Sequence, residues 1–348
     1  MQFCLPIRVG VEPMKRLLVA TFDGDPEFEA LEPQVFDDAV NGKGIRVLRY
    51  RKDGRVDVYW QPGVHVDPNS FTLGAGVHEF RETIIEPARF EIDERSLDLD
   101  VGFADARGRR VELQIHEDLD GKHGFPLLAP VGADIQKPKR LFLVFMPGID
   151  LVRRRRSSVS IRIGDSAPRP AGLPVLLGGH RVWFIRYAEN PIIWTLNPPA
   201  SCPVLFEGPA PGTVEVEGMM VSLDTGGRVM RITCGNEPRA SEMDFLPGFP
   251  NLIGLPDGAA SEGRWTVRLG GVDITGGAYS VSRAGDSVAI SLDVTEPWKP
   301  SGLPLSMKIF TRIIRKFRLW PTTYRWRSIV RDGEPPTMLC GWERLGAG

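Results

Sequence analysis

The sequence lacks the short motifs that mark the large enzyme classes. Neither GxxxxGK[ST] nor a GxGxxG between a strand and a helix occurs, so no phosphate-binding loop is predicted. GxSxG is absent too, which argues against an α/β-hydrolase. His78-Glu79 is not followed by the second histidine of HExxH, and the 4 cysteines include no CxxC pair. We therefore predict no metal site and no cofactor.

The chain also lacks a charge excess and any long apolar run. It has 43 basic and 44 acidic residues, a net charge of -1, which gives no reason to expect a nucleic-acid partner. No run of about 18 apolar residues is found, and residues 1–11 do not resemble a signal peptide. No Asn-x-Ser/Thr sequon occurs. We expect a soluble cytoplasmic protein, whose oligomeric state is open.

What the sequence does contain is a repeated pattern of short alternating strands separated by glycine turns. In residues 55–60, Val56, Val58 and Trp60 alternate with polar or aromatic residues, and Lys52-Asp53-Gly54 supplies the preceding turn. The 38 glycines and 30 prolines show no collagen period, so they fit many tight turns. The pattern predicts an all-β protein of two antiparallel β-barrel or sandwich halves.

Two segments interrupt this pattern. Proline and glycine crowd residues 197–212, so we place a domain boundary there and expect an N-terminal β domain over 1–200 and a C-terminal one over 201–348. Residues 21–40 carry seven acids and no base, which predicts a turn-rich entry segment with at most one short helix.

Residues 305–320 are the one segment with helical periodicity. Leu305, Ile309 and Ile313 recur every four residues, and lysines and arginines occupy much of the remaining surface. This predicts a short amphipathic helix near the C-terminus, ended by Pro321. Such a basic helix could lie on an anionic membrane surface or pack across a barrel mouth.

Two histidines are the candidate catalytic residues. His65 shares a strand face with Asp67, which could orient it as a general base. His116 begins an acidic, turn-rich stretch that runs to His123 and could do acid–base work or bind a cation. The alternative in both cases is a solvated polar surface. All five histidines lie at or before residue 180, so we expect any catalytic acid or base before residue 197.

Large aromatic side chains are the candidate ligand-binding residues. They could line a pocket for an apolar ligand or simply fill the core. The four that we select are Trp60, Trp183, Tyr187 and Trp194. The arginine run 153–156 reads as a solvated turn or protected strand edge, with anion binding as the alternative.

The closing segment 341–346, Gly-Trp-Glu-Arg-Leu-Gly, resembles the last strand of the tandem-lipocalin group that includes carotenoid hydratases. The aromatic residue directly precedes Glu343, whereas that group has a residue between the two. The resemblance implies two lipocalin-like halves, a pocket for a hydrophobic small molecule and, in some members, hydration, cyclisation or isomerisation. It assigns no catalytic residue to this chain.

Three functions follow from these observations. The first is binding of a hydrophobic small molecule in a β-barrel pocket, with isomerisation or hydration as a further step. The second is carbohydrate binding or processing on a β-sandwich, which would use the same aromatics beside a pair of carboxylates. The third is a non-enzymatic interaction module that uses the basic helix.

Overall fold

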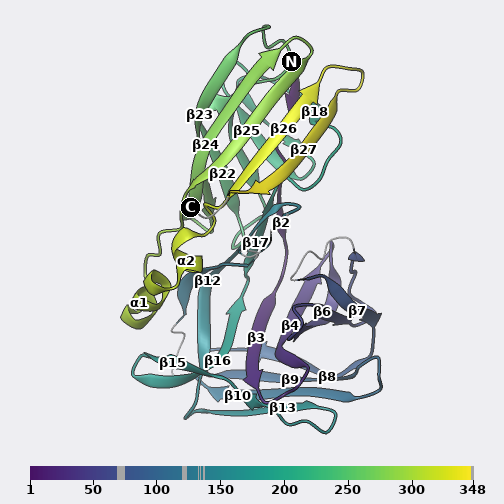
Figure 1. The fold of residues 1–348 in the computed structure, drawn as a ribbon, viewed down its shortest axis with the longest axis vertical. Coiled ribbons are helices and arrows are strands. Elements are labelled where there is room, and N and C mark those ends of the chain that lie inside the picture. The colour runs from purple at the N-terminus through teal and green to yellow at the C-terminus, as the bar shows by residue number, and fades with distance from the viewer. Residues whose placement is uncertain (69–74, 120–123, 132, 134, 136–137, 346–348) are drawn as a thin grey trace.

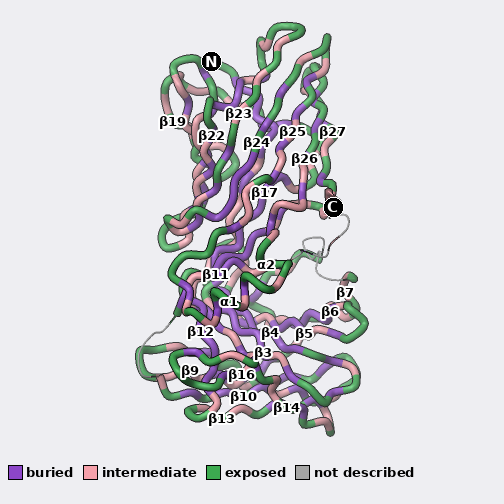
Figure 2. Tube along the Cα trace, turned by 60° about the vertical axis from the view of Figure 1, so that its left-hand side comes forward, coloured by how far each residue is buried: buried purple, intermediate pink, exposed green. Residues whose placement is uncertain are grey.

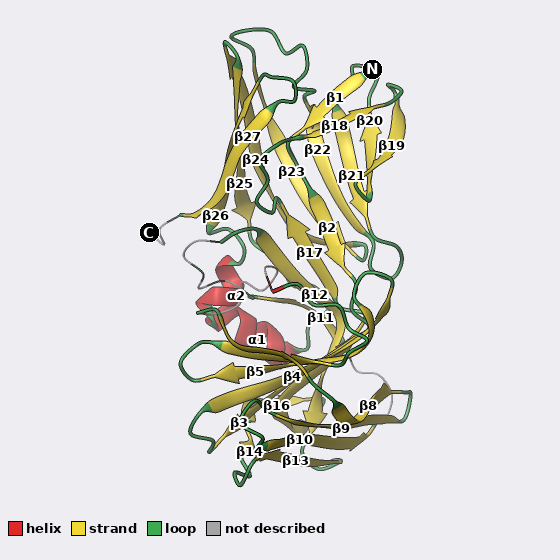
Figure 3. Ribbon diagram, turned by 90° about the vertical axis from the view of Figure 1, so that its right-hand side faces the viewer, coloured by secondary structure: helices red, strands yellow, loops and turns green. Residues whose placement is uncertain are grey.

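The computed structural model confirms an all-β protein with a short helical segment near the C-terminus (Figure 1). It describes residues 1–68, 75–119, 124–131, 133, 135 and 138–345. Figures 1 and 3 show two stacked β-structures, a lower one built mainly from the first half of the chain and an upper one from the second. No helix within the described ranges is long and apolar enough to cross a membrane.

The lower body contains a curled sheet of twelve strands. Its main path runs β2-β17-β12-β16-β3-β4-β5-β6-β7, and β11, β14 and β15 pair at its sides. All neighbours are antiparallel except β6 and β7, which run parallel. The strands are β2 (Val9–Glu12), β3 (Arg16–Asp23), β4 (Phe28–Asp38), β5 (Gly42–Arg51), β6 (Val56–Trp60), β7 (Val77–Glu82), β11 (Phe125–Ala129), β12 (Leu141–Arg153), β14 (Arg169–Pro170), β15 (Gly172–Leu177), β16 (His180–Glu189) and β17 (Ile192–Leu196).

A four-stranded sheet packs against one face of this curled sheet. Its order is β13-β10-β9-β8, with apolar residues alternating along each strand, as in Val111, Leu113 and Ile115. These residues form one core with Leu18, Val47 and others from the larger sheet, so the lower body is a sandwich. The strands are β8 (Ile85–Ile92), β9 (Ser96–Ala104), β10 (Arg110–Asp118) and β13 (Ser157–Ile163).

The upper body is a nine-stranded antiparallel meander. Each strand pairs with its neighbours in sequence, which requires only short hairpin connections for most of its length. The strands are β19 (Gly212–Val216), β20 (Met219–Leu223), β21 (Val229–Cys234), β22 (Ser241–Phe249), β23 (Ala260–Leu269), β24 (Val272–Ala284), β25 (Ser287–Glu296), β26 (Tyr324–Arg331) and β27 (Thr337–Arg344).

The N-terminus joins the two bodies. β1 (Gln2–Leu5) pairs with β18 (Val204–Glu207) beside the upper meander, while β2 belongs to the sheet of the lower body. One continuous apolar core contains residues of both halves, and buried residues run through the junction in Figure 2. The first residues therefore pack with the second half. The division at residue 200 remains a prediction.

The helical segment differs from the single four-turn helix that the periodicity predicts. It comprises α1 (Leu305–Ile313) and α2 (Arg315–Leu319), separated by Ile314 in an extended conformation. The interpretation of residues 21–40 as a turn-rich segment was wrong, because β4 spans most of it. Two acids of residues 21–40 have partners. Glu27 lies 3.0 Å from Arg109, and Glu32 accepts a 2.6 Å hydrogen bond from Tyr50.

Candidate functional site

A cavity of about 370 Å³ lies in the lower body where β11, β12 and β16 meet the segment before α1. Its volume is at the lower end of the range for ligand pockets. Apolar and charged side chains both contribute to it. The residues that line it are Asp118, Gly124, Phe125, Asp150, Arg153, Arg156, Leu177, Gly178, His180 and Pro304.

A β-bulge in β12 places the two central charged residues of this cavity. Asp150 and Arg153 are three positions apart, so a regular strand would direct them to opposite faces. The register against β16 shifts between Leu151 and Arg153. Both side chains are consequently buried, and the Arg153 guanidinium lies 2.8 Å from Asp150 Oδ2. Bulges re-aim side chains in this way next to active sites.

Glu117 is a second carboxyl group beside Arg153. It follows Ile115 by two positions in β10, so the strand's alternation carries it onto the buried face, where it is fully inaccessible to solvent. Its Oε1 accepts a 2.8 Å hydrogen bond from the Arg153 backbone N–H and lies 3.4 Å from the guanidinium Nη1. Its Oε2 is buried and has no hydrogen-bond partner within the described structure.

These groups, which we call the Arg153 cluster (Glu117, Asp150, Arg153 and Tyr187), contain two carboxyls and one guanidinium. Burial raises the pKa of Glu117 to about 7, opposed by Arg153 and reinforced by Asp150. The Tyr187 hydroxyl donates to Asp150 Oδ2 at 3.5 Å, and burial raises its pKa far above the ordinary value. A buried carboxyl with a raised pKa in a cluster that borders a cavity is a combination typical of functional sites.

The arginine run 153–156 is only partly the solvated turn that we expected. Arg153 is buried, and Arg154 stacks over the Trp183 ring with its guanidinium carbon 4.4 Å from the ring centroid. Arg155 and Arg156 are exposed, and Arg156 lines the cavity. The interpretation was wrong for Arg153 because the bulge turns that side chain inward.

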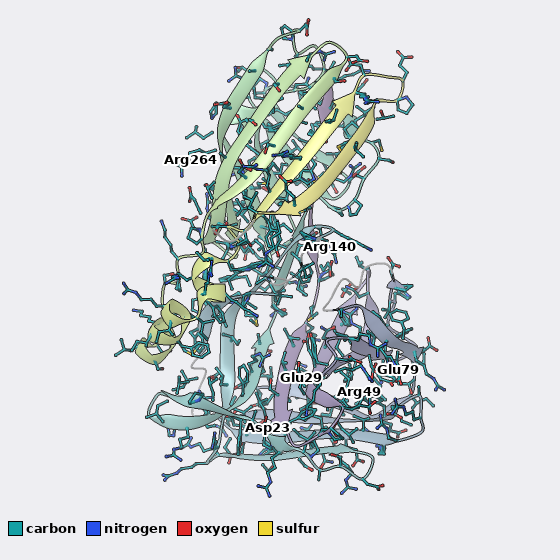
Figure 4. All side chains as sticks on the ribbon, in the orientation of Figure 1. Asp23, Glu29, Arg49, Glu79, Arg140 and Arg264 are labelled. Atoms are coloured by element: carbon teal, nitrogen blue, oxygen red, sulfur yellow. The ribbon has the colours of Figure 1, made fainter. Side chains whose placement is uncertain are left out.

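A second buried group of charges, the Arg49 cluster, lies elsewhere in the lower body. Arg49 contacts Asp57 at 2.8 Å and Asp105 at 3.0 Å, and all three side chains are fully buried. Glu79 lies 3.5 Å from the same guanidinium. Figure 4 labels Arg49 and Glu79 in the lower body. Because Asp105 comes from the β9–β10 turn and Arg49 from β5, the cluster ties the two sheets of the sandwich together.

The Arg49 cluster includes residues of metal-ligating type. Asp57, His78 and Glu79 offer ligand atoms within 4.8 Å of one another. The Arg49 guanidinium already contacts two of them, so a metal ion would meet a fixed positive charge.

A third polar group lies on the face of the large sheet opposite the sandwich core. Glu32 is buried there and accepts hydrogen bonds of 2.6 Å from Tyr50 and from Gln34. Burial raises the pKa of Glu32. Both of its carboxylate oxygens accept hydrogen bonds, so we assign it a packing role.

The two candidate catalytic histidines are not brought together. His116 is on the outer face of β10, about half exposed, with its Nδ1 2.6 Å from Asp98. His65 is exposed in the loop after β6, with its ring 3.4 Å from the Val40 carbonyl oxygen. Neither lines the cavity. Their catalytic role remains a prediction, and His123 lies outside the described residues.

The four candidate aromatic residues also occupy separate places. Tyr187 belongs to the Arg153 cluster. Trp183, on β16, is covered by the Arg154 guanidinium. Trp60 packs on Phe80 with ring centroids 4.5 Å apart. Trp194 is fully buried in the core shared by both halves. They do not converge on one pocket, and their binding role stays untested.

Sequence reasoning missed Glu117 and Asp150 as a pair. The available signal was a carboxyl in the apolar register of a strand, since Glu117 extends the series Val111, Leu113, Ile115. Comparison with protein-family models, curated proteins and solved structures found no match to this chain. The resemblance to the tandem-lipocalin group therefore remains a prediction.

Proposed function

We propose that this protein binds a small, largely apolar molecule with one polar group in the cavity beside the Arg153 cluster, and that this cluster exchanges a proton there. The observation that carries the proposal is that Asp150 and Arg153 form both a wall of the cavity and part of the buried cluster. Phe125, Leu177 and Pro304 supply the apolar wall.

Proton exchange is the chemistry that these groups support. A buried carboxyl with a pKa near 7 is present in both protonation states at neutral pH, as general acid–base catalysis requires. Glu117 is coupled to Asp150 through their shared arginine. Isomerisation and hydration both need such a proton donor and acceptor, in agreement with the expectation from the tandem-lipocalin resemblance.

The carbohydrate alternative has less support. A second cavity, of about 520 Å³, places Glu262 and Asp293 near Tyr279 in the upper body. The Tyr279 side chain is only 2% exposed and its hydroxyl donates to the Pro247 carbonyl at 2.7 Å. It therefore does not offer the open ring face on which a sugar would stack.

Fluorescence titration with 1-anilinonaphthalene-8-sulfonate tests the binding. This probe has an apolar body and one anionic group. We expect the wild-type protein to bind it, Leu177→Trp to lose most of the binding because the larger ring fills the cavity, and Leu177→Phe to be intermediate. Equal binding by all three folded proteins would refute the proposal.

A matched control excludes binding at the exposed apolar side chains of α1. The triple variant Leu305→Gln, Ile309→Gln, Ile313→Gln removes these side chains and leaves the cavity lining unchanged. It should bind the probe as the wild type does. Mass spectrometry of organic extracts from the purified protein would then search for a natural ligand that is depleted in Leu177→Trp.

A further inference from the structure

The helix α1 has two apolar faces, of which the fold uses one. Met307 and Thr311 are buried, and Phe310 packs against the core shared by both halves. Leu305, Ile309 and Ile313 are instead 76%, 53% and 75% exposed. At 3.6 residues per turn, these three side chains fall within an arc of roughly 80°, on the side away from the buried face.

Exposed apolar residues on a helix are costly in water unless a partner covers them. Single exposed apolar side chains are ordinary, whereas a contiguous row marks an interaction site. In Figure 1, α1 lies at the left margin of the molecule, where it projects beside the two bodies. Ser306 donates a hydrogen bond to the backbone carbonyl of Leu176. The Leu176 side chain, which is 53% exposed, is therefore a fourth apolar group beside the helix.

The charged residues of α1 and α2 are all basic. Lys308 and Arg312 follow Leu305 and Ile309 by three positions, and they are exposed. Arg315, Lys316 and Arg318 continue the basic surface into α2, and residues 305–320 contain no acid. The buried face fixes the orientation of the helix, so the apolar row and its basic flank face outward together.

We propose that α1 and α2 dock the protein on an anionic lipid bilayer, with Leu305, Ile309 and Ile313 inserted at the interface and the basic residues at the headgroups. An amphipathic helix with a basic polar face has the chemistry to bind in the plane of such a surface. An acidic protein with an apolar groove would match the same charge and the same apolar row, but such a groove encloses a helix. One face of α1 is already packed against the core of this protein, so only the outer arc is accessible. A bilayer surface needs only that arc.

Docking through α1 would bring the cavity close to the lipid surface. Pro304 is the N-cap residue of α1 and also lines the cavity. The protein would therefore hold its small-molecule cavity beside the lipid surface, where apolar molecules concentrate. The docking itself stands on the helix alone and does not rest on the proposed ligand binding.

Co-sedimentation of the full chain with vesicles tests the proposal. Vesicles of phosphatidylcholine with phosphatidylserine are compared with pure phosphatidylcholine at low salt. We expect sedimentation with the anionic vesicles, weakened by about fivefold for each basic residue removed, and hence about 30-fold for Lys308→Gln, Arg312→Gln. The triple variant Leu305→Gln, Ile309→Gln, Ile313→Gln should abolish binding.

Two control variants change the same residue types elsewhere. Ile84→Gln, Leu246→Gln, Leu339→Gln removes three apolar side chains that are 74%, 74% and 77% exposed, and it should bind vesicles like the wild type. Lys43→Gln, Arg162→Gln should lose less than Lys308→Gln, Arg312→Gln. Wild-type protein that stays in the supernatant, or equal binding by the helix and control variants, would overturn the proposal.

The remaining alternative is that a second copy of the chain covers the row. Sedimentation-velocity runs of the wild type and of the triple helix variant address it. A monomer in both supports the lipid surface as the partner. A wild-type dimer that the triple variant dissociates would show that the row is a self-interface and would contradict the proposal.

Discussion

The Arg49 and Arg153 clusters are both buried arginine–carboxylate groups, but their charges are matched differently. Each fully buried carboxylate of the Arg49 cluster faces two guanidinium groups: Asp105 contacts Arg49 and Arg109, and Asp57 lies near Arg49 and Arg51. In the Arg153 cluster, two carboxyls share one guanidinium within the described structure, and a cavity lies beside them.

The difference appears in the protonation of the fully buried acids Asp105 and Glu117, whereas burial and the neighbouring Asp57 also raise the pKa of the partly exposed Glu79. Although burial opposes it, hydrogen bonds from Arg49 and Arg109 hold the pKa of Asp105 below its ordinary value. Burial raises the pKa of Glu117 to about 7, because the positive charge of Arg153 offsets only part of the effect of burial. A matched buried cluster stabilises one arrangement of the sheets, whereas an unmatched one holds an exchangeable proton.

The largest effect on stability should come from Arg49→Met. It leaves Asp57 and Asp105 buried without their shared cation, and breaking such a pair costs about 3–5 kcal/mol. Urea unfolding measures the change. Arg55→Met removes an arginine from an exposed pair in the same hairpin and should cost less than about 1 kcal/mol. Similar losses in the two variants would contradict the structural role of the Arg49 cluster.

The next largest effect is the pH dependence of the free energy of unfolding that Glu117 causes. Because its pKa is raised in the folded protein, from 4.5 to about 7, the folded state keeps a proton that the unfolded state releases. Its contribution to stability is complete below about pH 4.5 and is lost as the pH rises to about 7, a difference of about 3 kcal/mol.

Glu117→Gln isolates this contribution, since the amide imitates the protonated acid. The free energy of unfolding is measured in urea at pH 5 and pH 8 for both proteins. The wild type should lose about 2–3 kcal/mol more than Glu117→Gln over this range, slightly less than the full difference because some of it is already lost at pH 5. Parallel pH profiles would show that Glu117 does not carry the proton.

The smallest effect should come from His116→Ala. Hydrogen bonding to Asp98 raises the pKa of His116 above its ordinary 6.5, so its contribution is present below that pH and lost as the pH rises through the raised value. The pair is exposed, so we expect less than about 1 kcal/mol at pH 5 and no change in probe binding. Loss of probe binding in this variant would support His116 as a site residue.

The sequence predicted the fold class because alternation survives in most strands. Val111 to Ile115 is one example, and the same series shows Glu117 to be buried. The strand β4 was missed because the acids of residues 21–40 suggested solvent exposure, whereas hydrogen bonds from Tyr50 and Gln34 allow Glu32 to be buried in the sheet. Periodicity alone does not show which charges will find partners.

The cavity was less accessible to sequence reasoning. Its wall combines Phe125, Leu177 and Pro304, which come from distant parts of the chain. The bulge that aligns Asp150 with Arg153 depends on the pairing of β12 with β16, and no local pattern encodes it. The helix was predicted from its period, but the period does not tell which of its apolar rows the fold covers.

The pH dependence of probe binding tests the central claim most directly. When Glu117 ionises, it adds a negative charge near the cavity, so the affinity for 1-anilinonaphthalene-8-sulfonate should fall by about tenfold with a midpoint near pH 7. His180, Asp118 and Arg156 also face the cavity and are the same in Glu117→Gln. The account predicts that this fall is absent in Glu117→Gln and unchanged in Glu79→Gln, a variant of the Arg49 cluster. Identical profiles for the wild type and Glu117→Gln would contradict it.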